Sequence, residues 1–230
     1  MLTNVNNLQV LFEDNHLILV NKRSSDIVQG DKTGDTPLSE VVKLWLKKKY
    51  NKPGNVFLGV VHRIDRPVSG VVLFAKTSKA LSRLSEAFRM KEIEKTYLAA
   101  VVSRPGNEEG QLTDFLIRDH KKNKSRVVKG KKNAKESKLK YKLIGASDNY
   151  FFLEVCPETG RHHQIRVQLA AMGCAIKGDI KYGAPRTNKN ASIHLHAFKL
   201  EFVHPVTKQK LSFKAPLPED PVWNAVKNLV

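Results

Sequence analysis

The chain has 230 residues, and 40 Lys and Arg against 22 Asp and Glu give it a formal net charge of +18. Hydrophobic residues make up 41% of the chain, which is enough to build a core and excludes a wholly disordered basic tail. Its two cysteines are too few for a disulfide framework, and it has no apolar run of about 18 residues that would span a membrane.

Short apolar runs bounded by polar residues predict buried strands in the first half of the chain. These runs lie at 16–20, 55–61, 70–75 and 96–102. Two amphipathic stretches predict helices between them. The first is expected to run from Pro37 toward Tyr50 with Thr36 as its N-cap, and the second is expected to follow an N-cap at Ser78.

The second half of the chain is also rich in predicted strands. They lie at 138–144, 150–155, 192–203 and 210–214. Helices are expected at 161–172, ending before Gly173, and at 221–229. Because strands outnumber helices and many gaps have hairpin length, we predict an α+β fold with a mixed, largely antiparallel central sheet flanked by helices and loops.

The positive charge is concentrated in one segment. From Arg118 to Lys142 the chain carries 12 Lys or Arg and two acids, with few apolar residues. We expect a basic loop or hairpin at 118–137, inserted into one domain that spans 1–230, to follow a phosphate backbone. The Lys47-Lys48-Lys49 run is interpreted as a solvated helix face.

The overall charge predicts a polyanionic partner, most commonly a nucleic acid. The alternative is a lysine-rich surface that only keeps the protein soluble. The N-terminal residues lack the pattern of a secretory signal, so we expect a cytoplasmic protein without membrane association.

The string HRIDRPVSG at 62–70 lies between two predicted strands, so Asp65 is expected on a tight connecting loop. Arg63 and Arg66 flank it, and a neighbouring guanidinium favours the ionised carboxylate. An ionised Asp on a rigid loop is suited to act as a nucleophile or general base. The alternative is a structural Asp that satisfies loop amides or forms a salt bridge.

The string TGRHHQIRVQL at 159–169 predicts the start of a helix on which His162 and Arg166 lie one turn apart, opposite an apolar stripe. Polar groups near a helix N-terminus suit an anionic ligand. For His163 and Gln168 we expect a solvated polar face instead.

An aromatic residue and the histidines complete the candidate chemistry. Tyr97 opens a predicted strand and can stack on a nucleobase, although it also suits the rim of a core. His194 and His196 share a strand face, yet no HExxH or paired CxxC spacing supports a metal site. We therefore expect neither metal nor cofactor, and a metal-dependent nuclease that uses the histidines is an alternative.

Together these strings resemble the RluA-type family of RNA pseudouridine synthases. Five motifs follow one another in the family's order: LFEDNHLILVNK at 11–22, HRIDRPVSG at 62–70, KTYLAAV at 95–101, TGRHHQIRVQLAAMGCAIKGDIKYG at 159–183 and IHLHAFKLEFVHPVTKQKLSFKAPLP at 193–218. The resemblance implies the pseudouridine synthase fold. It also implies isomerisation of uridines in structured RNA, ribosomal or transfer, to pseudouridine by base flipping, without a cofactor.

The resemblance assigns roles to individual residues. Asp65 would act at the ribose–uracil junction, Tyr97 would pack on the uracil and help manage a proton at its C5, and Arg166 would pair with Asp65. Arg63 would enter the RNA stack in place of the flipped nucleotide. The substrate-binding residues that we predict are His62, Arg63, Arg66, Lys121, Lys122, Lys124, Arg161, His162 and Ile165.

The sequence departs from the family pattern in places. The family's NKPxG is here Asn21-Lys22-Arg23-Ser24-Ser25, and its His after IRV is Gln168. Because the resemblance begins near residue 11, we expect a stand-alone catalytic domain without an S4 domain, monomeric and without an obligate protein partner. The alternative function is a non-catalytic RNA-binding or ribosome-assembly module on the same fold.

Overall fold

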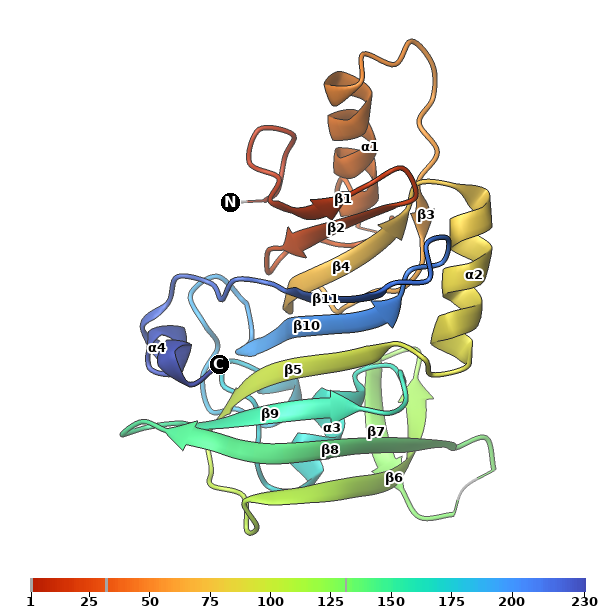
Figure 1. Cartoon of the computed structure of the whole chain (residues 1–230). Helices are drawn as coiled ribbons and strands as arrows, with labels where there is room; N and C mark the ends of the chain where they lie inside the picture. The colour runs from red at the N-terminus through yellow and green to blue at the C-terminus, as the bar shows by residue number, and fades with distance from the viewer. Residues whose placement is uncertain (1, 32, 131) are drawn as a thin grey trace. The chain divides into compact units, whose positions relative to one another are not determined.

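The chain forms two compact units, which are coloured by residue number in Figure 1. The structure, a computed structural model, describes residues 2–31, 33–130 and 132–230. The first unit comprises Met1–Glu94 and Ala197–Pro216, and the second comprises Lys95–His196 and Leu217–Val230. The single catalytic domain over 1–230 and the insertion at 118–137 stay predictions.

The first unit is built on strands in the order β1-β2-β4-β10, with β3 beside β4 and β11 beside β10. The strands are β1 (Val10–Glu13), β2 (Leu17–Lys22), β3 (Gly59–Val60), β4 (Ser69–Ala75), β10 (Leu195–Val203) and β11 (Lys210–Lys214). The β1–β2, β2–β4, β3–β4 and β10–β11 pairs are antiparallel. All residues of β4 are buried, as expected for an inner strand with both faces covered.

Two helices belong to this unit, α1 (Leu38–Lys49) and α2 (Ser78–Arg89). The buried residues of α1 include Leu38, Val42 and Leu46, which recur every four positions and therefore form one apolar face. Helix α2 packs against β3 and β4 (Figure 1).

Gly70 fixes the point where the Asp65 loop joins β4. Its φ is +120°, a conformation that side chains rarely adopt, and a Cβ at this position would lie 2.2 Å from the backbone oxygen of Ala197. Both the dihedral angle and the close approach of a neighbouring backbone require glycine. The loop therefore ends at a position that the sheet itself determines.

The second unit is an antiparallel sheet in the order β5-β9-β8-β6-β7. Its strands are β5 (Glu94–Val101), β6 (Glu109–Asp119), β7 (Lys124–Val128), β8 (Lys135–Ala146) and β9 (Phe151–Pro157). The helical segments are α3 (Gln164–Ala171), η1 (Ile180–Tyr182), α4 (Pro221–Asn224) and η2 (Lys227–Leu229). Val167 of α3 packs with Leu116 of β6 and Tyr182 in a buried cluster.

The predicted α+β class with a largely antiparallel sheet is confirmed. Two predicted helix caps are wrong by one residue. The N-cap of α1 is Pro37, not Thr36, and no side chain caps that helix. Helix α2 is capped by Thr77 rather than Ser78, because the Thr77 hydroxyl accepts a 3.2 Å hydrogen bond from the Ala80 amide.

Other elements differ in extent from the predictions. The strand expected at 55–61 is only β3, and the helix expected at 221–229 is divided into α4 and η2. The helix expected at 161–172 begins at Gln164, because His163 has a left-handed backbone with φ of 54°. Gly173 does follow the end of α3, with φ of +87°.

The basic segment 118–137 holds more regular structure than a solvated loop. It contains the end of β6, the 120–123 turn, β7 and the start of β8, while Lys131 lies outside the described residues. Of the helices in the part of the chain that the structure describes, none is long and apolar enough to cross a membrane.

Candidate functional site

The candidate catalytic residue Asp65 lies on the loop that joins β3 to β4 in the first unit. Ile64 and Val68 on either side of it are buried, whereas Asp65 is half-buried and Arg63 is exposed. The Val68 amide donates a 3.0 Å hydrogen bond to the Asp65 carbonyl, which closes a turn. The two buried apolar residues anchor the loop in the core, and Asp65 between them keeps part of its surface exposed.

His62 shapes the same loop from its N-terminal side. The backbone amide of Leu73 in β4 donates a 2.9 Å hydrogen bond to His62 Nε2, so the side chain takes the place of a backbone partner beyond β3. The imidazole also stacks on Phe88 of α2, with ring centroids 4.8 Å apart. These contacts position the loop, and the substrate contact of His62 stays a prediction.

Lys22, the last residue of β2, lies beneath the loop with 0% of its surface exposed. Its Nζ donates to the carbonyls of Arg23 at 2.8 Å and Arg66 at 3.1 Å. Burial lowers the pKa of Lys22 to about 7, and the nearby charges of Asp26 and Asp65 oppose that shift. Lys22 therefore ties the end of β2 to the residue after Asp65.

Arg66 also joins the loop to the polar segment before α1. Its Nη2 lies 2.7 Å from Asp35 Oδ2, and both side chains are well exposed. The Arg66 carbonyl accepts a second hydrogen bond, from the Ser25 amide at 2.9 Å. The backbone of Arg66 is thus fixed, while its guanidinium group remains at the surface.

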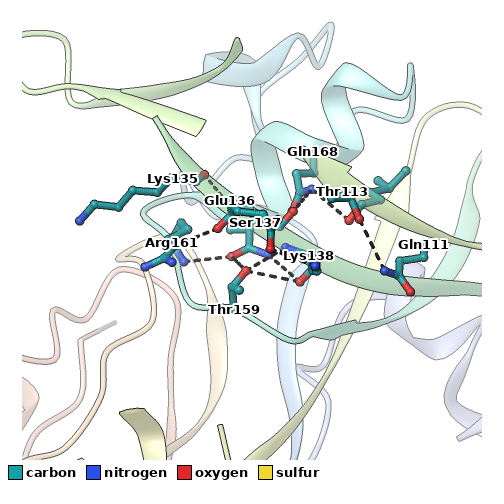
Figure 2. A network of polar contacts seen from close by, with 11 residues as sticks. Gln111, Thr113, Lys135, Glu136, Ser137, Lys138, Thr159, Arg161 and Gln168 are labelled. Carbon is teal, nitrogen blue, oxygen red and sulfur yellow. Dashed lines mark hydrogen bonds and ion pairs between the residues drawn. The ribbon is translucent and has the colours of Figure 1, made fainter. Parts of the chain in front are cut away.

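In the second unit, the side chains of Thr159 and Gln164 join the start of α3 to Lys138 of β8 by hydrogen bonds. Figure 2 shows Thr159 and Lys138 within this polar network. The Thr159 hydroxyl accepts from the Lys138 amide at 2.9 Å and donates to Gln164 Oε1 at 2.7 Å. Gln164 Nε2 donates to the Lys138 carbonyl at 3.0 Å. Gln164 Oε1 also accepts a hydrogen bond from the Arg161 amide at 3.0 Å. These hydrogen bonds therefore fix the backbone that carries Arg161.

Gln168 does not lie on a solvated face, so that prediction is wrong. Its side chain has 0% exposure, and its Nε2 donates to Asp114 Oδ2 at 2.7 Å and to the Ser137 carbonyl at 3.3 Å (Figure 2). The amide extends toward β6 and β8 and bonds to both strands. His163 is half-buried and lies 2.9 Å from the Tyr182 hydroxyl.

Arg166 is buried and forms a bidentate ion pair with Asp179. Its Nε lies 2.6 Å from Asp179 Oδ2, and its Nη2 lies 2.8 Å from Oδ1. The guanidinium carbon is also 5.1 Å from the centre of the Tyr182 ring. Sequence reasoning missed Asp179 as a partner of Arg166. The predicted pairing of Arg166 with Asp65, a residue of the first unit, stays a prediction.

The remaining predicted residues of the second unit differ in their exposure. Tyr97 of β5 is half-buried opposite Val155, and Ile165 of α3 is buried. Lys121 and Lys122 are exposed in the turn between β6 and β7. The Nζ of Lys124 lies 5.2 Å from the centre of the Tyr182 ring, so one aromatic ring contacts both Lys124 and Arg166.

His162 is held by the β6–β7 hairpin. Its Nδ1 lies 2.9 Å from Ser125 Oγ, and its Nε2 lies 3.1 Å from Asn123 Oδ1. Its ring also stacks on that of His163, with centroids 3.8 Å apart. Across residues 2–31, 33–130 and 132–230, no group of three or more His, Cys, Asp or Glu side chains could hold a metal ion.

Known proteins are similar to this chain over most of its length. Residues 16–171 match the family model described as RNA pseudouridylate synthase. The ribosomal large subunit pseudouridine synthase C of Buchnera aphidicola subsp. Acyrthosiphon pisum (strain APS) is 34% identical over 219 residues, which are 92% of this chain and 68% of that protein. The enzyme of the same name from Vibrio vulnificus (strain CMCP6) is 33% identical over 216 residues, 91% of this chain and 66% of that protein.

The chain thus spans about two thirds of the length of the curated relatives it matches. Among solved structures, Human RNA Pseudouridylate Synthase Domain Containing 4 has the same fold, with a TM-score of 0.79. It is 24% identical, and the match covers 96% of this chain and 92% of that one. From the family match and the identity to these relatives, the chain belongs to the RNA pseudouridylate synthase family.

Proposed function

We propose that this protein isomerises uridine to pseudouridine in RNA, with Asp65 as its catalytic residue. The observation that carries the proposal is the family match over residues 16–171, because Asp65, Tyr97 and Arg166 all lie within it. The position of Asp65 supports the role, since a half-buried carboxylate on an anchored loop is accessible to a substrate.

The proposed reaction needs no redox step. It breaks the bond between N1 of uracil and C1′ of ribose, turns the uracil and joins C5 to C1′. C5 loses a proton and N1 gains one, so the product is an isomer of the substrate. The carboxylate of Asp65 assists at the ribose–uracil junction. The uridine must leave the base stack to reach it, and Arg63, which is exposed, fills the vacated position.

Two residues of the second unit complete the proposed chemistry. The ring of Tyr97 packs on the uracil and helps manage the proton at C5. Arg166 supplies a positive charge from a buried position, where charge interactions are stronger than in water. Its bond to Asp179 supports this role, because it fixes the guanidinium in one orientation.

The proposed substrate is ribosomal RNA, because the curated relatives are named ribosomal large subunit pseudouridine synthases. The excess of positive charge suits a polyanionic substrate. His62, Arg66, Lys121, Lys122, Lys124, Arg161, His162 and Ile165 are proposed to bind it. We propose further that the protein works in the cytoplasm as a monomer, without an obligate protein partner.

Substitution of Asp65 tests the proposal. The full chain and its Asp65→Asn variant are incubated with deproteinised bacterial large-subunit ribosomal RNA, and pseudouridine is mapped by carbodiimide labelling. We expect Asp65→Asn to bind RNA as the unmodified chain does and to form no pseudouridine, because the amide cannot act as a carboxylate. Asp148→Asn, at an exposed turn, is the matched control and should be fully active. Full activity of Asp65→Asn would contradict the proposal.

A further inference from the structure

The second unit has a hollow of about 550 Å³ between the β6–β7 hairpin, the start of β8 and the residues before α3. Three cationic side chains, Arg118, Lys135 and Arg161, line it together with His120 and His162. Among the described residues that line the hollow there is no Asp or Glu and no Phe, Tyr or Trp. Its charge is therefore of one sign, and it offers no aromatic ring for a base to stack on.

The strand register explains why cations gather on this face. Leu116 of β6 is opposite Lys135 of β8, and Arg118 is opposite Ser125 of β7. Because alternate residues of a strand share a face, Leu116 and Arg118 point the same way. Leu116 lies in the buried cluster with Val167 of α3. The same face of the sheet is thus apolar at Leu116, where it packs on α3, and cationic at the neighbouring Arg118 and Lys135.

Hydrogen bonds hold two of the lining guanidinium groups in place. Arg161 Nε donates to the Glu136 carbonyl at 3.1 Å, and Arg118 Nη2 donates to Asn123 Oδ1 at 3.0 Å. Figure 2 shows the side chain of Lys135 extending away from the polar network, on the side where Arg161 lies. The partners in these hydrogen bonds are neutral oxygens, so they do not cancel the positive charge of Arg118 and Arg161. That charge, together with the charge of Lys135, can attract an anionic ligand.

We propose that this hollow binds the phosphodiester backbone of the substrate RNA, rather than its bases. This inference rests on the proposed function. Cations accompanied by Ser, Asn and His donors are typical of phosphate contacts, which position an RNA without reading its sequence. The volume exceeds that of one phosphate group, and exposed Lys121 and Lys122 add positive charge in the turn next to His120, which lines the hollow. A polyanionic backbone therefore fits better than an isolated anion.

The test compares two double variants of the full chain that lose the same charge. Arg118→Gln/Lys135→Gln removes two cations of the hollow, and Lys47→Gln/Lys48→Gln removes two exposed cations of α1. The affinity for deproteinised bacterial large-subunit ribosomal RNA is measured by filter binding over a potassium chloride series. At about 100 mM salt, the hollow variant should bind at least about tenfold more weakly than the unmodified chain, with a salt slope smaller by about 1.4 to 1.8.

The control should change affinity by less than about threefold, as expected for cations that lie apart from bound phosphates. Arg118→Lys/Lys135→Arg retains both charges and should bind as the unmodified chain does. Circular dichroism confirms that each variant is folded. Equal losses in the hollow variant and the α1 control would overturn the inference, because net charge alone would then explain them. A loss in the charge-retaining variant would also overturn it.

Pseudouridine formation in the same preparations separates this inference from the proposed function. If the unmodified chain forms no pseudouridine while the hollow variant alone loses affinity, the proposed function fails and the backbone site stands. If pseudouridine forms while the hollow variant binds RNA like its control, the backbone site fails and the proposed function stands.

Discussion

Among the residues that the structure describes, a buried cation lies at the candidate site of each unit, and the two units stabilise that cation differently. In the first unit, Lys22 donates to two backbone carbonyls, and its burial lowers its pKa to about 7. In the second unit, Arg166 forms two short bonds to the carboxylate of Asp179. An arginine stays protonated at any working pH, whereas a buried lysine can lose its charge. In the first unit, the titratable Lys22 holds the loop of Asp65 in place. In the second unit, Asp179 holds the permanently charged Arg166 in one orientation.

The largest expected effect comes from breaking the buried pair. Asp179→Ala leaves the guanidinium of Arg166 buried without its carboxylate, and the free energy of unfolding should fall by about 3–5 kcal/mol. Urea unfolding followed by circular dichroism measures it. The double variant Arg166→Met/Asp179→Leu replaces the pair by apolar groups of similar size, so it should recover most of that loss. If single and double variants were equally unstable, the ion pair would not be the cause.

The second prediction concerns the pH dependence of stability. Folded Lys22 loses its proton near pH 7, whereas in the unfolded chain a lysine keeps its proton to about pH 10.4. Between these values the unfolded state binds more protons, so Lys22 makes the free energy of unfolding rise with pH, by about 1 kcal/mol per pH unit.

Lys22→Met removes this contribution while it keeps an unbranched apolar side chain. Urea unfolding of both proteins at about pH 7, 8 and 9 should therefore show a stability difference that grows in favour of the unmodified chain as the pH rises. Parallel curves would mean that Lys22 has the same protonation in the folded and unfolded states.

The smallest expected effect is at Arg66. Its ion pair with Asp35 is 2.7 Å long, yet the two side chains are 41% and 39% exposed. Exposed pairs contribute about 0–1 kcal/mol, and Lys22 binds the Arg66 carbonyl, which an alanine retains. Arg66→Ala should therefore lower the free energy of unfolding, measured by urea unfolding, by no more than about 1 kcal/mol. The loss should be smaller at high salt, which screens an exposed ion pair. A loss above about 2 kcal/mol would show that the guanidinium holds the loop.

The contrast also marks how far the sequence could predict the site. The loop position of Asp65 and the start of a helix near Arg166 follow from local signals, a Pro- and Gly-containing break and a 3.6-residue periodicity. The pairing with Asp179 does not, because it joins residues 13 positions apart that only the fold of the 172–179 segment brings together. The burial of Lys22 is equally hidden, since lysine is rarely fully buried.

Charge also concealed part of the fold. The sequence predicts a loop or hairpin at 118–137, and the structure has the β6–β7 hairpin there; the lysines at the start of β7 and β8 gave no local sign of how far the strands extend. Likewise, Gln168 suggested a solvated helix face, but its partners Asp114 and Ser137 lie on β6 and β8. Pairing between strands decided the first outcome and packing of α3 against those strands decided the second, and no local sequence pattern encodes either.

We propose that the carboxylate of Asp65 performs uridine isomerisation. Its most direct test is a single-turnover reaction, with the full chain in excess over large-subunit ribosomal RNA, in which pseudouridine per RNA is followed with time. We expect the unmodified chain to reach one pseudouridine per RNA site and Asp65→Asn to form none while it retains its affinity for the RNA. The same plateau reached by Asp65→Asn would show that this carboxylate is not the catalytic group.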